Sequence, residues 1–260
     1  MKTVILCGGR GTRLNEETEF RPKPLVPVGG RPILWHIMKL YSHFGFNDFI
    51  LCLGYKGEMI KQYFLNYDEL AHDFTLSLDS GKKKITHHNH QTPKWRITFA
   101  DTGLETETGS RIARIKQYIG NDKEFFLTYG DGVANVDIKK LLSYHRAKKK
   151  IVTVTGIQPT NPFGVIEAES GLVKSFIEKP QSKDLTSGGF FVCNRKLFDY
   201  LSPDSSCVLE QDPLRTIAKQ GQLAVYHHHD FWHCVDTLKD VKGLAYHYDQ
   251  GNRPWMLWEK

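Results

Sequence analysis

Long apolar runs and paired cysteines are both missing from this sequence. Its 260 residues hold no window near the roughly 18 consecutive apolar residues of a membrane-spanning helix. The N-terminus lacks the basic stretch and apolar core of a signal peptide. The five cysteines are scattered, odd in number and form no Cys-x-x-Cys pair, which argues against a disulfide framework or a zinc site. We therefore expect a cytoplasmic protein with buried free thiols and no membrane contact.

Low-complexity linkers and internal repeats are also missing, so we expect one domain over residues 1–260. The composition is ordinary for a globular protein, with 40% hydrophobic and 25% charged residues. The net charge of +6 suits anionic small ligands or nucleic acid and does not by itself decide between them.

Extended apolar runs alternate with helical patterns in the first half. This alternation predicts an α/β fold with a Rossmann-like, mostly parallel mixed sheet flanked by helices. The expected strands are Thr3–Cys7, Phe49–Leu53 and Phe125–Tyr129. The expected helices are Pro32–Phe44, Glu58–Tyr67, Arg111–Ile119 and Ile138–Lys148.

The second half is richer in strand patterns. They cover Ile151–Gln158, Gly164–Glu167, Val173–Glu178, Gly189–Asn194 and Leu223–His229. A polar, basic segment over 79–99 predicts a small protruding hairpin at about 81–95, read as either a solvated protrusion or a subunit contact. Nucleic-acid binding through Lys82–Lys84 is disfavoured, because no aromatic side chains are interleaved with the lysines.

A glycine-rich loop follows the first expected strand, in "CGGRGTRL". The third glycine of a dinucleotide fingerprint is absent, since Gly9 and Gly11 are followed by Leu14, and no Walker Lys-Ser or Lys-Thr is present. Glycines let a backbone approach phosphate closely, and Arg13 can grip phosphate oxygens bidentately. The loop therefore indicates a nucleoside triphosphate that is attacked, rather than a dinucleotide that is held for hydride transfer.

A second cation lies in a stiff segment, where Lys23 is flanked by Pro22 and Pro24. Prolines restrict the backbone on both sides and fix where the ammonium points. A Pro-Lys-Pro can also be just a rigid loop, but beside the glycine-rich turn we interpret Lys23 as a phosphate ligand.

Motifs along the whole chain resemble the sugar-phosphate nucleotidyltransferase family, and most of all its glucose-1-phosphate cytidylyltransferase branch. They are "ILCGGRGTRL", "RPKPLVPVGGRPILWHIM", "YGDGV", "FIEKP", "GGFFV" and "DTLKD", in that order. The resemblance implies transfer of a cytidylyl group from CTP to a sugar-1-phosphate such as glucose-1-phosphate, giving an NDP-sugar and pyrophosphate. It also implies a nucleotide-binding half over 1–135 and a sugar-phosphate-binding half with a C-terminal helix over 136–260.

By this resemblance, Arg13, Lys23 and Lys179 are the catalytic cations, and Asp131 and Asp236 hold a Mg²⁺ ion. Read locally, Asp131 can be a turn residue, Asp236 a helix N-cap, and Lys179 an ordinary surface lysine. The expected nucleotide-binding residues are Leu6, Cys7, Gly8, Gly9, Arg10, Gly11, Thr12, Thr106, Thr108, Gly109, Arg111 and Gly130. The expected acceptor-binding residues are Gly164, Glu178, Ser187 and Gly188.

Four segments depart from the branch pattern. Ser187 replaces Asn, Pro162 replaces Arg, Val208–Leu209 replace Thr-Trp, and "FWHCVDT" replaces "FWQPMDT". Because these segments are expected to line the acceptor side, a different phosphorylated acceptor, even a non-sugar one used in surface-polysaccharide modification, remains an alternative. A non-catalytic nucleotide-binding module is a second alternative. A homo-oligomer is expected by analogy, with no nucleic-acid partner. His227–His229 cannot all ligate one metal, because successive strand residues point to opposite faces.

Overall fold

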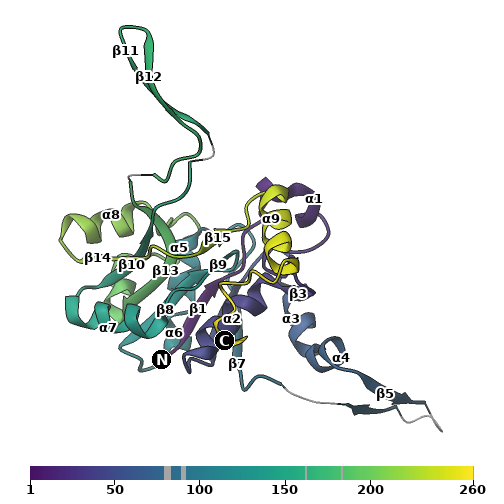
Figure 1. Cartoon of the computed structure of the whole chain (residues 1–260). Helices are drawn as coiled ribbons and strands as arrows, with labels where there is room; N and C mark the ends of the chain where they lie inside the picture. Colours follow the sequence, from purple (N-terminus) through teal and green to yellow (C-terminus); the bar gives the residue numbers. More distant parts are fainter. Residues whose placement is uncertain (79–82, 89–91, 162, 183, 260) are drawn as a thin grey trace.

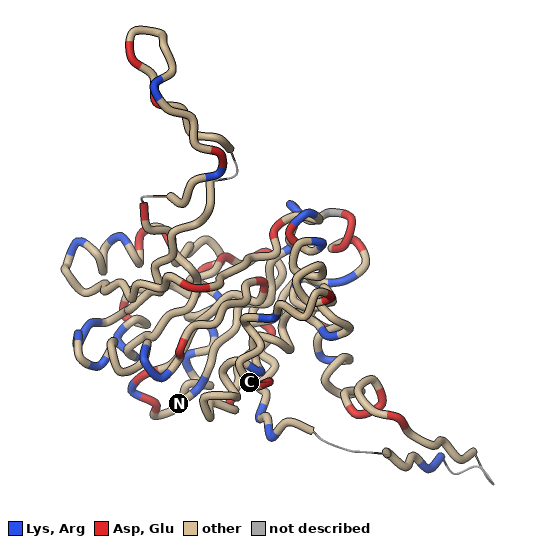
Figure 2. The backbone as a smooth tube through the Cα atoms, viewed as in Figure 1, with Lys and Arg blue, Asp and Glu red and all other residues tan. Residues whose placement is uncertain are grey.

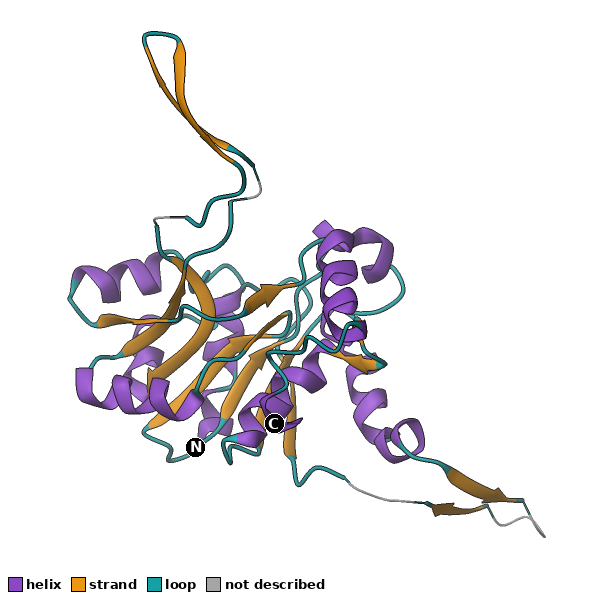
Figure 3. Ribbon diagram, viewed as in Figure 1, coloured by secondary structure: helices purple, strands orange, loops and turns teal. Residues whose placement is uncertain are grey.

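A seven-stranded mixed sheet lies at the centre of the molecule (Figures 1 and 3). The computed structural model describes residues 1–78, 83–88, 92–161, 163–182 and 184–259. In sheet order, the strands are β14 (Leu223–His227), β10 (Val152–Ile157), β13 (Thr186–Asn194), β8 (Glu124–Tyr129), β1 (Thr3–Leu6), β4 (Asp48–Leu53) and β7 (Arg96–Asp101). Strands from both halves of the chain thus share one sheet.

The pairing is mostly parallel. β1 runs parallel to β4 and β8, β4 to β7, and β10 to β14, whereas β13 is antiparallel to both of its neighbours. The predicted α/β class with a mostly parallel mixed sheet is confirmed. Because the carboxyl ends of β1, β4 and β8 lie at one edge, the loops that follow them meet there.

Helices cover both faces of this sheet, and the side chains of β1 show why. Ile5 packs into the hydrophobic cluster on one face, while Val4 and Leu6 pack into the cluster on the other. The first face is covered by α2 (Ile33–His43), α3 (Gly57–Leu65), α7 (Ile138–Lys148) and α9 (Leu238–Asp249). The second face is covered by α5 (Thr108–Arg114), α6 (Lys116–Ile119) and α8 (Asp212–Lys219). Among the described residues, no helix has the length and apolar character needed to cross a membrane.

The predicted helix bounds are matched unevenly. α7 has the predicted ends, because Asp137 caps it by accepting a hydrogen bond from the Lys140 amide at 2.9 Å. The helix expected over Glu58–Tyr67 is instead two, since α3 ends at Leu65 and α4 occupies Tyr67–Ala71. The helix expected over Arg111–Ile119 is likewise divided into α5 and α6, and α5 begins three residues earlier, at Thr108.

Short helices and strands lie in the connections between the main elements. They are η1 (Thr12–Leu14), α1 (Asn15–Thr18), η2 (Lys23–Leu25), β2 (Pro27–Val28), β3 (Arg31–Pro32), β9 (Gly132–Ala134), η4 (Arg195–Tyr200), β15 (Trp232–Cys234) and η5 (Leu257–Glu259). β2 pairs with β3, and β9 pairs with β15.

Two hairpins project from the body in Figure 1. One is β5 (Phe74–Ser77) with β6 (Lys84–His87), which overlaps the protrusion expected at about 81–95 but begins seven residues earlier. Residues 79–82 and 89–91, Lys82 among them, lie outside the described residues. The other is β11 (Val165–Glu169) with β12 (Leu172–Ile177), close to the strands expected over Gly164–Glu167 and Val173–Glu178, and it stands away from the central sheet. Acidic and basic residues are interspersed along this second hairpin in Figure 2. Pro162, one of the positions that depart from the branch pattern, lies outside the described residues.

Candidate active site

The glycine-rich loop leaves the end of β1 at the edge where the parallel strands finish. It is tied to the neighbouring strand ends through backbone hydrogen bonds, from the Cys7 amide to the Cys52 carbonyl and from the Tyr55 amide to the Gly8 carbonyl, both at 3.0 Å. A Cβ atom on Gly8 would lie 2.2 Å from a guanidinium nitrogen of Arg111. The same atom on Gly9 would meet nothing within 4 Å, so the loop is closed on one side and open on the other.

Arg111 was predicted to contact the nucleotide, but its guanidinium is committed to the protein. It is 4% exposed and donates hydrogen bonds to carbonyl oxygens at the ends of three strands or loops and to the Thr102 hydroxyl. The carbonyl acceptors are those of Gly8, Leu53, Gly103 and Leu104, at 2.7–3.1 Å. Arg111 therefore holds together the loops that form the floor of the site.

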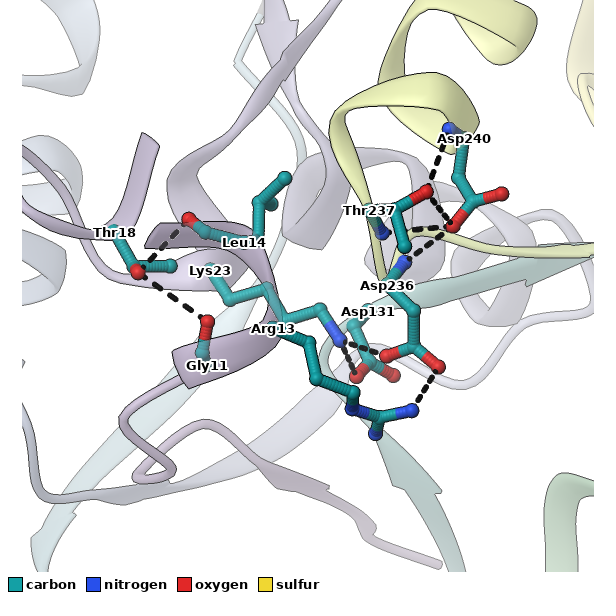
Figure 4. Close-up of polar contacts among 9 residues, drawn as sticks. All are labelled: Gly11, Arg13, Leu14, Thr18, Lys23, Asp131, Asp236, Thr237 and Asp240. Carbon is teal, nitrogen blue, oxygen red and sulfur yellow. Dashed lines mark hydrogen bonds and ion pairs between the residues drawn. The ribbon is translucent and has the colours of Figure 1, made fainter. Parts of the chain in front are cut away.

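Lys23, Asp131, Asp236 and Arg13 meet in one cluster (Figure 4). Lys23 Nζ lies 2.7 Å from Asp131 Oδ2 and 2.6 Å from Asp236 Oδ1. Arg13 approaches the other oxygen of Asp236, at 2.7 Å. Four of the predicted catalytic and metal-binding residues are thus brought together, although their motifs are spread over more than two hundred residues of the chain.

Strand pairing explains how the two aspartates meet. β9 follows Asp131 directly and pairs antiparallel with β15, which ends two residues before Asp236. The Val235 amide then donates to the Asp131 carbonyl at 2.8 Å. Asp236 is not the N-cap of α9, the alternative open from sequence, because Thr237 fills that position and forms a capping box with Asp240.

The cluster keeps Lys23 charged. Burial favours the neutral amine, but the ion pair with Asp131 and the hydrogen bonds to both aspartates outweigh it and raise the pKa of Lys23. Cys234 lies beside the same carboxylates, and burial, with Asp131 and Asp236 nearby, raises the pKa of its thiol. The site therefore holds positive charge beside two carboxylates and a neutral thiol.

The donor set fits a divalent ion. One oxygen each from Asp131 and Asp236 and the Cys234 sulfur lie within 4.8 Å of one another. Two carboxylates that leave room for water and phosphate oxygens are what Mg²⁺ takes from proteins. Lys23 already places a cation between these oxygens, which shows that the pair accepts positive charge there.

Two cavities adjoin at this cluster, and Arg13, Tyr129 and Asp131 line both. The first has a volume of about 310 Å³ and extends over the glycine-rich loop and Thr106–Thr108. Of the predicted nucleotide-binding residues, it is lined by Leu6, Cys7, Gly8, Gly9, Gly11, Thr106, Thr108, Arg111 and Gly130. The second, of about 280 Å³, is lined by Ser187 and Gly188, two of the predicted acceptor-binding residues, and by Trp232 and Asp236.

Several predicted residues lie elsewhere. Arg10 is exposed and forms an ion pair with Glu105, and Thr12 is exposed beside it. A Cβ on Gly109 would lie 2.8 Å from the Cys207 carbonyl, so this glycine allows close packing of a loop.

The structure does not bring the rest of the acceptor set to the two cavities. Gly164, Glu178 and Lys179 flank the β11–β12 hairpin. The side chains of Glu178 and Lys179 are 60% and 57% exposed and lie 3.6 Å from each other. The assignment of Gly164 and Glu178 to the acceptor, and of Lys179 as a catalytic cation, stays a prediction.

Sequence reasoning missed a small network around Tyr129. The Glu210 carboxylate accepts hydrogen bonds from the Tyr129 hydroxyl and, at 2.6 Å, from the Thr108 hydroxyl. Burial, with Glu210 as its neighbour, raises the pKa of Tyr129, which stays a neutral donor. Position in the sequence was a usable signal, because Tyr129 ends β8 directly before Gly130.

β14 ends at His227, so the strand expected over Leu223–His229 does not include the last two of the three consecutive histidines. The rings of His227 and His229 are 6.1 Å apart, while His228 is buried and its Nε2 lies 3.1 Å from the Phe231 carbonyl oxygen. They form no metal-binding group within the part of the chain that the structure describes.

Comparison with known proteins gives consistent results. The model of the family described as "Nucleotidyl transferase" matches residues 2–251. A protein of Bacillus subtilis (strain 168) named "Probable glucose-1-phosphate cytidylyltransferase" is 48% identical over 258 residues, covering 99% of this chain and all of the relative. The glucose-1-phosphate cytidylyltransferase of Salmonella typhi is 45% identical over 260 residues, with full coverage of both chains.

Solved structures share the fold. The crystal structure of HddC from Yersinia pseudotuberculosis superposes with a TM-score of 0.69 at 21% identity, covering 95% of this chain and 99% of that one. At this identity the likeness concerns the fold, which agrees with the sheet order and helical layers described above.

Proposed function

This chain belongs to the nucleotidyl transferase family, and from that premise we propose that it transfers the cytidylyl group of CTP to glucose-1-phosphate, giving CDP-glucose and pyrophosphate. The supporting observation is the pair of cavities that meet at Arg13, Tyr129 and Asp131. One cavity has the glycine-rich floor that suits a triphosphate, and the other opens beside Ser187 and Gly188. The phosphates of a nucleotide in the first cavity and of an acceptor in the second would lie next to each other beside these three shared residues.

The reaction needs positioning and charge neutralisation more than covalent chemistry. An acceptor phosphate oxygen attacks the α-phosphorus of CTP, and the bond from this phosphorus to the bridging oxygen of pyrophosphate breaks. Arg13 and Lys23 lie at the junction of the cavities, where they offset the repulsion between the two anions. With a triphosphate bound, both cations exchange a carboxylate contact for phosphate oxygens.

The family generally uses a divalent metal, and we propose Mg²⁺ held by Asp131 and Asp236. When bound, this ion supplies charge stabilisation to the phosphate oxygens at the reacting phosphorus. Asp131 is suited to this task because it lines both cavities. A Cβ on Gly130 would lie 2.9 Å from the Leu6 carbonyl oxygen, so this glycine lets the loop of Asp131 pack closely against the end of β1.

The β11–β12 hairpin bears on both the acceptor site and the oligomeric state. Phe163, Leu172 and Phe176 on or beside it are 61–75% exposed, and a two-stranded hairpin has no core of its own. We propose that a second copy of the chain covers these residues, as expected for a homo-oligomer, and that Lys179 meets the acceptor in this assembly. Sedimentation velocity on the full chain tests the proposal, since a monomer at micromolar concentration contradicts it.

A pyrophosphate-release assay tests the reaction, crossing four nucleoside triphosphates with a panel of phosphorylated acceptors. We expect turnover with CTP and glucose-1-phosphate, and a loss of about 100-fold or more in Asp131→Ala and Asp236→Ala. Asp249→Ala, which changes an exposed carboxylate at the end of α9, is the matched control and should be fully active. Normal turnover in either site variant contradicts its role as a metal ligand.

The same panel addresses the alternative acceptor. Ser187 lines the acceptor cavity where the branch pattern has Asn, so one hydrogen-bonding amide is replaced by a hydroxyl. A preference for another phosphorylated acceptor would favour that alternative while leaving nucleotidyl transfer intact. Binding of CTP without any pyrophosphate release would favour the non-catalytic module.

A further inference from the structure

Cys234 brings a sulfur atom to a site otherwise made of oxygens. Its Sγ lies within 4.8 Å of one carboxylate oxygen each of Asp131 and Asp236. The residue ends β15, opposite Gly132 of β9, so the strand pairing that joins the two aspartates also fixes the sulfur beside them. All three side chains line the acceptor cavity.

A sulfur ligand changes which metal ions a site prefers. Carboxylates alone suit Mg²⁺, whereas thiolates select softer ions such as Zn²⁺ and Cd²⁺. We propose that Cys234 Sγ is a third protein ligand at the carboxylate pair, so that this site binds thiophilic divalent ions in competition with Mg²⁺. The inference rests on the proposed function in one respect, namely that Asp131 and Asp236 are the metal ligands.

The spacing permits such a site after a small adjustment. Ligand bonds of about 2.0–2.3 Å around a tetrahedral zinc ion place neighbouring ligand atoms about 3.3–3.8 Å apart. The three atoms therefore need to close by about 1 Å, within the reach of side-chain rotation at a half-buried surface. The ion would lie among the oxygens that now contact Lys23 Nζ, and it would replace the ammonium as their counter-charge.

Binding changes protonation and leaves the oxidation state unaltered. A metal–sulfur bond forms, and the thiol proton passes to solvent. Three protein ligands leave one position of a tetrahedral ion open, fewer than the several positions that Mg²⁺ keeps for water and phosphate oxygens. The structure thus predicts that a soft ion is held tightly in the absence of substrate and inhibits turnover.

Direct metal binding to the full-length protein, without nucleotide or acceptor, tests the inference. Cd²⁺ is titrated while thiolate-to-cadmium charge-transfer absorption is followed in the ultraviolet. The wild type should gain one such band per chain. Cys234→Ser should lose it and bind Cd²⁺ about 10- to 100-fold more weakly, the scale of losing one group at a metal site. Excess Mg²⁺ should diminish the wild-type band by competition.

Cys207→Ser is the matched control, since Cys207 is also half-buried but packs against Gly109. This variant should keep the full band. Absence of the band in the wild type, its persistence in Cys234→Ser, or its loss in Cys207→Ser overturns the inference. Pyrophosphate release with Mg²⁺ is measured in parallel, so that a missing band with normal turnover rejects the third ligand alone, and a normal band without turnover rejects the proposed function alone.

Discussion

The ammonium nitrogen of Lys23 lies 2.7 Å from Asp131 Oδ2, although 108 residues separate the two along the chain. The same nitrogen contacts Asp236, which lies 105 residues after Asp131. One lysine near the glycine-rich loop is thus paired with the aspartates of two distant loops. Lys23 is 9% exposed, and its neighbours Pro22 and Pro24 restrict the backbone that carries it. In the ligand-free protein, this lysine is the cation that keeps two carboxylates close together.

Removal of that cation should make stability depend on divalent metal. In Lys23→Met, Asp131 and Asp236 face each other without the ammonium, at a cost of about 1–3 kcal/mol. For a chain of this size, we expect the melting temperature in EDTA to fall by about 2–4 °C per kcal/mol. Because Mg²⁺ can replace the missing charge, it should raise the melting temperature more in the variant than in the wild type. Equal metal-induced shifts in both proteins would contradict this account.

The fold and the centre of the site were largely predictable from sequence. Buried strands and amphipathic helices give strong periodic signals, and α7 has the bounds expected from the sequence, Ile138–Lys148. Lys23 stood out because prolines constrain its loop, whereas Asp131 and Asp236 were assigned through the family resemblance. Such signals come from short stretches of sequence, and they predict a residue's position well where the end of a strand holds the loop that contains it.

Features that depend on tertiary contacts could not be predicted from the sequence. The sequence does not reveal that the Arg111 guanidinium donates hydrogen bonds to loop carbonyls at the strand ends, because these acceptors lie far from Arg111 along the chain. Glu210 acts through Tyr129, 81 residues away, and no spacing rule connects them. The β11–β12 hairpin has a strand-like composition similar to that of the other strands expected in the second half, so its position outside the central sheet had no signature in the sequence.

The two first glycines of the loop should respond differently to alanine. Gly8→Ala places a Cβ 2.2 Å from the Arg111 guanidinium, which cannot move without losing its hydrogen bonds to the strand ends. We expect a stability loss of about 1–3 kcal/mol, typical of overpacking, measured by urea denaturation. In Gly9→Ala the Cβ points into open space at the nucleotide cavity, so stability should be unchanged and the KM for CTP should rise. Equal stability of the two variants would count against this difference.

The start of α9 should weaken in acid. Burial favours the protonated form of Asp240, but hydrogen bonds from the hydroxyl and amide of Thr237 outweigh it and lower the pKa of Asp240. Since the folded-state pKa lies below the unfolded value of about 3.9, this stabilisation is complete above that pH and disappears as the pH falls through the folded value. The stability gap between wild type and Asp240→Asn should thus be constant near neutrality and close below about pH 4.

Substitutions at Thr237 distinguish the contribution of the N-cap hydroxyl from that of the Asp240 charge. Thr237→Ala should cost about 1 kcal/mol at pH 7 in urea denaturation, and Thr237→Ser, which keeps the hydroxyl, should cost much less. A gap between wild type and Asp240→Asn that widens in acid would show that the sign of the pKa shift is wrong.

Glu210 should affect both substrates, because the tyrosine that it holds lies in the wall common to the two cavities. Glu210→Ala frees the hydroxyls of Tyr129 and Thr108, and we expect the KM for CTP and for the acceptor to rise together by about 2- to 10-fold, the worth of a hydrogen bond. Tyr129→Phe removes one of the same bonds, so adding it to Glu210→Ala should have little further effect on either KM. Tyr200→Phe is the matched control, since the Tyr200 hydroxyl bonds Gln220 at 2.6 Å and lines neither cavity. Additive effects in the double variant would mean that Glu210 and Tyr129 act on the substrates separately.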